Sequence, residues 1–165
     1  QSRSSAASDV YKRQRVGHSF IKAKMAETNA VFGGEHSAHY YFRDFWRADS
    51  GMLAAMHVLA ALGQQDKPLS EMMAKYNRYA ASGEINSRLD SAEAQADRTE
   101  AVVKAFADRA ENVDRLDGVT VELKDGNWFN VRASNTEPLL RLNVEADTQE
   151  AVDALVKEIL AIIRA

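Results

Sequence analysis

The nine residues from Asn130 to Pro138 (Asn-Val-Arg-Ala-Ser-Asn-Thr-Glu-Pro) carry side chains suited to binding an anion. Arg132 offers a planar fork of donors that matches the oxygens of a phosphate. Ser134, Asn135 and Thr136 add hydroxyl, amide and backbone N–H donors in one short turn, and several N–H groups facing one point bind anions. Ordinary strand connections use the same residue types. The residues therefore predict an anion-binding loop, with a plain connection as the alternative.

A second polar group follows the glycine pair Gly33-Gly34, which allows a tight turn. Glu35, Ser37 and His39 alternate, so an extended backbone would place them on one side. A carboxylate accepts two hydrogen bonds at once and, beside a hydroxyl, suits adjacent sugar hydroxyls. The alternatives are a polar turn between strands and a metal site that includes His36. The metal site is disfavoured, because the spacing is loose and no third ligand is evident.

Three further residues are candidates on spacing alone. His18 and Lys22 lie four residues apart and would share one face of a helix. Arg141 precedes Leu142 in an alternating run and would point away from the core, where it could add charge to the anion loop or pair with an acid on a neighbouring strand.

The stretch Arg132 to Pro138, continued by Leu139 to Ala146, closely resembles the C-terminal phosphate-binding loop of the α-D-phosphohexomutases. Gly17 to Lys22 and Gly33 to Phe42 resemble two further stretches of that family, in the same order. Within the family, the chain from about Arg15 to Ala165 is most similar to bacterial phosphomannomutase/phosphoglucomutase. Three motifs in family order are a specific signal, whereas one alone would be weak.

The resemblance implies an isomerase that moves a phosphoryl group between the 1- and 6-positions of a hexose. The family works through a phosphoserine, a bound Mg²⁺ and a glucose or mannose 1,6-bisphosphate. The implied phosphate-binding residues are Arg132, Ser134, Asn135 and Thr136, with Arg141 as an additional candidate. The implied sugar-binding residues are Glu35, Ser37 and His18, with Lys22 and His39 as additional candidates. The family has glycine where this chain has Ala38, and a positive φ there would cost alanine about 1 kcal/mol.

Neither the phosphoserine loop nor the acidic metal loop of the family is found in these residues. The chain starts at Gln1 and its first methionine is Met25, so we expect a C-terminal fragment whose partners are a phosphorylated hexose and the N-terminal mutase domains. We expect no catalytic residue, no bound cofactor and no mutase activity in this piece alone. One alternative is a non-catalytic sugar-phosphate binding module. The other is a helix-rich interaction protein, but that class would leave the three polar motifs unexplained.

Composition narrows the class of protein further. The net charge is 21 − 24 = −3, so no basic surface favours nucleic acid or an anionic membrane as a partner. There are no cysteines, which excludes disulfides and thiolate chemistry and suits a cytoplasmic protein. The longest apolar run, Met52 to Leu62, is too short to span a bilayer.

The pattern of apolar residues predicts the elements that carry these loops. In the first part we expect a helix over 15–28, a strand over 30–32, a helix capped by Asp49 or Ser50 and running to Leu62, and a short helix over 69–76. In the second part we expect strands over 85–89, 119–123, 127–133 and 139–146. Two helices with capping boxes at Asp97/Glu100 and Asp147/Glu150 complete it.

The predicted order β-α-β-β-β-α gives an antiparallel sheet with two helices on one face, which is an α+β arrangement. The resemblance implies a TATA-binding-protein-like C-terminal domain, preceded by the end of the third α/β domain of the mutases. The predicted divisions are 1–14, foreign to the family, 15–77, the end of the third domain, and 78–165, the fourth domain.

Overall fold

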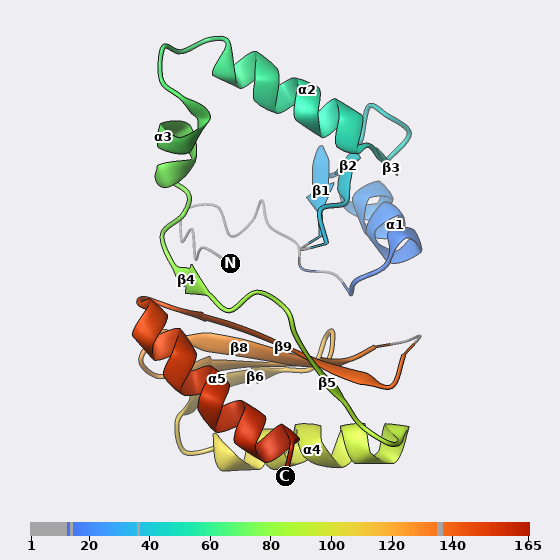
Figure 1. Cartoon of the computed structure of the whole chain (residues 1–165). Coiled ribbons are helices and arrows are strands. Elements are labelled where there is room, and N and C mark those ends of the chain that lie inside the picture. Colours follow the sequence, from blue (N-terminus) through green and yellow to red (C-terminus); the bar gives the residue numbers. More distant parts are fainter. Residues whose placement is uncertain (1–12, 14, 36, 135–136) are drawn as a thin grey trace. The chain divides into compact units, whose positions relative to one another are not determined.

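The computed structural model describes residues 13, 15–35, 37–134 and 137–165 (Figure 1). The chain divides into two compact units, Gln1–Leu69 and Ser70–Ala165. Each unit has its own buried cluster and its own candidate loop.

The first unit contains a helix and a three-stranded antiparallel sheet. Helix α1 (His18–Thr28) is followed by β1 (Phe32–Gly34), β2 (Tyr40–Phe42) and β3 (Ala48–Asp49), in the sheet order β1-β2-β3. The buried cluster is small and consists of Ile21, Met25 and Tyr41. The expected strand over 30–32 lies two residues too early, since β1 includes the two glycines that were expected to end it.

Helix α2 (Gly51–Leu62) contains the longest apolar run of the sequence and is apolar on nearly all sides. The Ser50 hydroxyl caps it by accepting a hydrogen bond from the Leu53 amide at 3.1 Å. None of its residues is buried within the described part of the chain, and Met52, Met56 and Leu59 are 76%, 59% and 64% exposed. A short helix, α3 (Leu69–Ala74), follows it.

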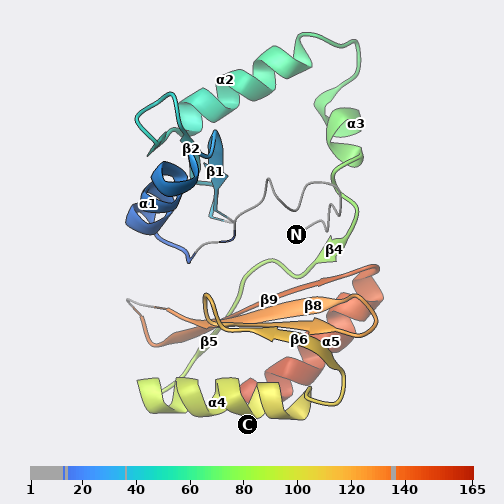
Figure 2. The same cartoon turned by 180° about the vertical axis from the view of Figure 1, so that it is seen from behind.

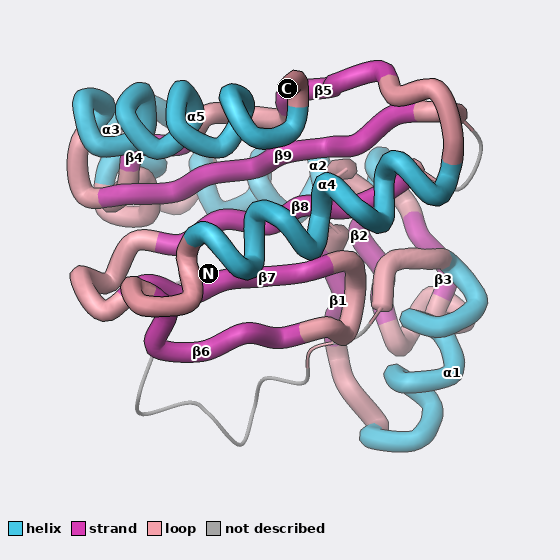
Figure 3. Tube along the Cα trace, turned by 90° about the horizontal axis from the view of Figure 1, so that it is seen from below, coloured by secondary structure: helices cyan, strands magenta, loops and turns pink. Residues whose placement is uncertain are grey.

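The second unit is an antiparallel sheet covered on one face by two helices, as predicted (Figures 1 and 2). The strands are β4 (Ala80–Ala81), β5 (Ile85–Arg88), β6 (Ala110–Asp114), β7 (Val119–Leu123), β8 (Trp128–Ala133) and β9 (Leu139–Ala146). Their order is β4-β9-β8-β7-β6, and β5 also pairs with β9. Helices α4 (Ala92–Ala105) and α5 (Gln149–Ile163) lie across the same face of this sheet (Figure 3).

Alternation along the strands decides which face is covered. On β9, Leu140, Leu142 and Val144 are buried, while the residues between them are half-buried. The stripe predicted on α5 packs into the same core, with Val152, Leu155, Ile159 and Ile163 buried and Val156 partly buried. On the opposite face of the sheet lie the polar residues Asn130, Arg132, Arg141 and Asn143.

Both predicted capping boxes are wrong. The α4 cap is Ser91, whose hydroxyl accepts from the Ala94 amide at 3.1 Å, and Asp97 lies inside the helix. The α5 cap is Thr148, whose hydroxyl accepts from the Ala151 amide at 3.2 Å. In each case the residue that caps the helix carries a hydroxyl group, and the Asp-x-x-Glu pattern did not identify it.

Candidate functional site

The predicted phosphate loop connects β8 to β9 in the second unit. Its ends are closed by a hydrogen bond from the Ser134 amide to the Leu139 carbonyl at 2.8 Å. The Glu137 amide donates to the Ser134 hydroxyl at 3.3 Å. Asn135 and Thr136, predicted to bind the phosphate, lie outside the described residues.

Two arginines stand side by side next to this loop. Arg132 on β8 and Arg141 on β9 are direct partners in the antiparallel register, and both side chains are on the open face of the sheet. Like charges placed directly opposite each other destabilise a sheet. The pair therefore places two guanidinium groups beside the loop, where a nearby anion would relieve the repulsion.

Carboxylates offset this repulsion in the described structure. Arg132 Nη1 lies 3.5 Å from Asp117 Oδ2, and Arg141 Nη1 lies 3.5 Å from Glu84 Oε2. Arg141 Nη2 also lies 3.8 Å from Glu137 Oε2. The sequence left open whether Arg141 serves the loop or pairs with acids. The structure shows two acidic partners and a 3.5 Å contact from Arg141 Nη2 to the Ser134 hydroxyl.

The predicted sugar loop lies between β1 and β2 in the first unit. The Glu35 amide donates to the His39 carbonyl at 2.9 Å, and the Ala38 amide donates to the Glu35 carbonyl at 3.0 Å. This is a closed turn, so the expected extended alternation of Glu35, Ser37 and His39 is wrong. Ala38 has φ 64°, the positive value for which the glycine of the family is better suited.

Glu35 is held by two donors. Its carboxylate accepts from the Gly17 amide at 3.0 Å and from the Tyr41 hydroxyl at 2.9 Å. Burial, and then the hydrogen bond to Glu35, raise the pKa of the Tyr41 phenol well above its usual range, so the hydroxyl stays a donor. Glu35 is thus fixed next to the Gly-His-Ser segment, while Ser37 is exposed in the turn.

Asp49 brings the two predicted histidines together. His39 Nδ1 lies 3.0 Å from Asp49 Oδ2, and His18 Nδ1 lies 3.6 Å from Asp49 Oδ1. The hydrogen bond with His39 is the main cause that lowers the pKa of the Asp49 carboxyl. A carboxylate on Nδ1 leaves Nε2 of each ring as the remaining polar atom. The sequence predicted Asp49 only as a possible helix cap, and its contacts with the two histidines were not predicted.

Lys22 lies one turn along α1 from His18, as the spacing predicted. Within the described residues, the structure shows Lys22 in no ion pair. His36, considered as a metal ligand together with His39, lies outside the described residues.

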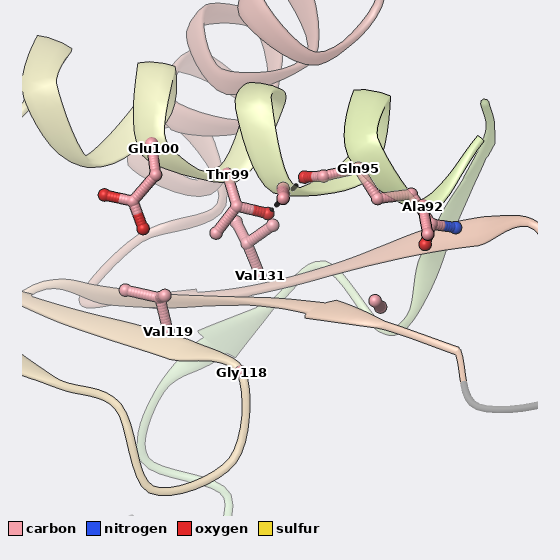
Figure 4. Close-up of a pocket in the computed structure, with 9 residues that line it drawn as sticks. Ala92, Gln95, Thr99, Glu100, Gly118, Val119 and Val131 are labelled. Atoms are coloured by element: carbon pink, nitrogen blue, oxygen red, sulfur yellow. Dashed lines mark hydrogen bonds between the residues drawn. The ribbon is translucent and has the colours of Figure 1, made fainter. Parts of the chain in front are cut away.

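A separate groove of about 350 Å³ lies on the helix-covered face of the second unit (Figure 4). Gln95 and Thr99 of α4 line one side of it, and Val119 and Val131 of the sheet line the other. The groove is mostly apolar, and Arg132 and Arg141 do not line it. It is therefore distinct from the phosphate loop.

The described residues include neither a cluster of metal ligands nor a candidate membrane-spanning helix. No three His, Asp or Glu side chains among them are arranged to hold an ion. The described residues therefore contain no set of side chains that fits the Mg²⁺ implied by the family resemblance. No helix in the described ranges combines the length and the apolarity needed to cross a membrane.

Comparison with known proteins identifies the family of the chain. Residues 6–79 match the family model described as phosphoglucomutase/phosphomannomutase, alpha/beta/alpha domain III. Residues 84–162 match the model of the phosphoglucomutase/phosphomannomutase C-terminal domain. The chain belongs to the phosphoglucomutase/phosphomannomutase family.

The chain is also similar in sequence to individual members of the family. The chain is 44% identical over 133 residues to "Phosphohexose mutases" of Xanthomonas campestris pv. campestris, covering 79% of this chain and 29% of that protein. It is 41% identical over 151 residues to a phosphomannomutase of Methanocaldococcus jannaschii, covering 92% of this chain and 32% of the relative. The chain thus spans about a third of the length of the relatives it matches.

A solved structure shares the fold. A phosphoglucomutase/phosphomannomutase family protein from Burkholderia thailandensis superposes with a TM-score of 0.71 and 29% sequence identity. The match covers 92% of this chain and 32% of that protein. The predicted family and fold class are therefore confirmed.

Proposed function

We propose that this chain is the hexose- and phosphate-recognition part of a phosphomannomutase/phosphoglucomutase. The parent enzyme would interconvert hexose 1-phosphate and hexose 6-phosphate in the cytoplasm, with Mg²⁺ and a hexose 1,6-bisphosphate supplied through parts outside these residues. The domain boundary belongs near residue 77, with the third mutase domain before it and the fourth after it.

The observation that carries this proposal is the register pair Arg132–Arg141 beside the β8–β9 turn. Two guanidinium groups on one open sheet face, next to the Ser134 hydroxyl, match a doubly charged phosphate monoester. Arg132, Ser134, Asn135 and Thr136 would bind the phosphate that is not transferred, and Arg141 would add charge.

In the first unit, Glu35 supports the sugar-binding part of the proposal. Its carboxylate is already oriented by Gly17 and Tyr41, so it can accept from sugar hydroxyls without a large loss of side-chain freedom. Ser37 and His18 would complete the contacts, and His39 and Lys22 are further candidates.

Binding the distal phosphate contributes to catalysis in the parent enzyme through positioning. Remote binding energy holds the reacting end of a substrate in place. We expect the chain alone to bind a hexose phosphate without isomerising it.

Chemical-shift mapping with mannose 6-phosphate tests the proposal. We expect saturable shifts of amides at both 33–42 and 132–141, and no conversion of mannose 1-phosphate by the pure chain. Shifts at neither loop would overturn the binding proposal, and detectable conversion would overturn the proposed division of labour.

The runner-up function is a sugar-phosphate binding module that works as it stands. It would use the same two loops, but it leaves the exposed apolar side chains of α2 unexplained. The mutase proposal assigns the N-terminal domains of the enzyme as the cover for this helix. Charged substitutions at Met56 and Leu59 should therefore make the pure chain less prone to associate without weakening hexose phosphate binding.

A further inference from the structure

A hairpin turn in the second unit, residues 115–118 between β6 and β7, lies against the strand that carries Arg132. Its Asp117 carboxylate is 3.5 Å from Arg132 Nη1. The two side chains are 26% and 24% exposed, so the contact is partly shielded from solvent. The contact is therefore more than a pair of freely solvated surface charges.

The backbone of the turn is also in close contact with Arg132. Gly118 has φ +66°, and a Cβ placed on it would come 2.5 Å from the Val131 carbonyl oxygen and 2.9 Å from the Arg132 Cα. The absence of a side chain at Gly118 lets the turn approach this closely. Asp117, one residue earlier, is thereby brought beside the Arg132 side chain.

Two further contacts hold the turn in this position. Asn130 Nδ2 donates to the Asp117 carbonyl oxygen and to the Thr120 hydroxyl, both at 3.0 Å. On the other side of the turn, both guanidinium nitrogens Nη1 and Nη2 of Arg115 donate to the Glu100 carboxylate of α4, at 2.6 and 2.9 Å. The turn is thus fastened to β8 and to α4.

We propose that Asp117 is a positioning residue that holds the guanidinium of Arg132 in place for a phosphate. A guanidinium has five N–H donors, so the contact with Asp117 leaves others for an incoming anion. An arginine that is already oriented loses less conformational freedom on binding. The inference rests on the proposed function, since it assumes that Arg132 contacts phosphate.

Positioning by Asp117 and simple electrostatics predict opposite changes in anion affinity when the carboxylate is removed. Removing a carboxylate beside an anion site should strengthen anion binding by Coulomb attraction alone. If Asp117 positions Arg132, its removal weakens binding. The expected loss is about two- to twelve-fold, the factor that corresponds to immobilising one long side chain on binding.

The experiment compares the full chain with its Asp117→Ala and Asp117→Asn variants. Mannose 6-phosphate affinity is measured at constant salt, and the mobility of the Arg132 Nε–H group is measured by NMR without ligand. Asp117→Asn keeps an oxygen acceptor of the same size, so it should retain more of both the affinity and the order than alanine. Asp108→Asn is the matched control, because it removes one charge just before β6, at the end of the β6–β7 hairpin away from the turn.

The expected result is weaker binding and a more mobile Arg132 in Asp117→Ala, with Asp108→Asn unchanged. Equal or tighter binding by Asp117→Ala, or an Arg132 that stays equally ordered in it, would overturn the proposal. The ligand-free measurement separates this proposal from the proposed function. A wild-type chain with an ordered Arg132 that binds no mannose 6-phosphate would contradict the function itself.

Discussion

Substitution of Gly118 by alanine tests how tightly the β6–β7 turn is pressed against β8. At φ +66° an alanine carries about 1–2 kcal/mol of backbone strain. Its Cβ would also meet the Val131 carbonyl oxygen at 2.5 Å. Val131 is 1% exposed and pairs with Val119 in the ladder, so it cannot retreat without disturbing the core. Overpacking of this kind costs about 1–3 kcal/mol. The expected total is about 2–5 kcal/mol in the free energy of unfolding.

Gly83→Ala is the matched control, because Gly83 has φ +65° and a Cβ placed on it would have nothing within 4 Å. Both substitutions reduce the entropy of the unfolded chain equally, so that contribution cancels in the comparison. Urea unfolding is followed by Trp128 fluorescence in a Trp46→Phe background, which leaves one tryptophan in the chain. Gly118→Ala should be less stable than Gly83→Ala by about 1–3 kcal/mol. Equal losses in the two variants would refute the close approach of the turn.

Three other predictions concern the helix cap and the sugar loop. Ser91→Ala should lower the free energy of unfolding by about 1 kcal/mol, whereas Asp97→Ala should change it little, as urea unfolding would show. Tyr41→Phe removes a partly buried 2.9 Å hydrogen bond to a carboxylate and should destabilise the first unit by about 1.5–3 kcal/mol, measured by hydrogen exchange. The pKa of Asp49 is lowered by His39, so its ionised form contributes stability above about pH 3.9 that is lost as the pH falls through the lowered value. In His39→Ala the Asp49 midpoint, followed by ¹³C NMR, should rise toward about 3.9; an unchanged midpoint would contradict the pairing.

Much of the second unit could be predicted from the sequence because its elements follow simple periodicities. The alternation on β9 and the stripe on α5 each identify one buried face without outside information. Strand β6 was not predicted, because Ala110–Asp114 lies at the edge of the sheet and has the sequence of a polar loop. Its pairing with β7 decides its structure, and that pairing is a tertiary contact.

The residue types of the candidate site could be predicted from the sequence, but the residues that hold them in place could not. The sequence identified Arg132, and its position in a strand followed from the alternation of β8. Asp117 was missed because its partner is 15 residues away in the chain and on another strand. A signal was available, since an Asp-Gly dipeptide before a strand is typical of a tight turn, and Asp117-Gly118 precedes the strand predicted over 119–123. Likewise, the contacts of Asp49 with His18 and His39 depend on how β2, β3 and α1 pack together.

The most direct test of the account is the affinity of the chain for mannose 6-phosphate with and without the guanidinium of Arg132. Arg132→Ala is compared by calorimetry with Lys124→Ala, which removes one positive charge at the other end of β7. A charged hydrogen bond contributes about 1.5–3 kcal/mol, so Arg132→Ala should weaken binding about ten- to hundred-fold while Lys124→Ala leaves it nearly unchanged. Equal affinity of the two variants would contradict the claim that the β8–β9 loop recognises the phosphate.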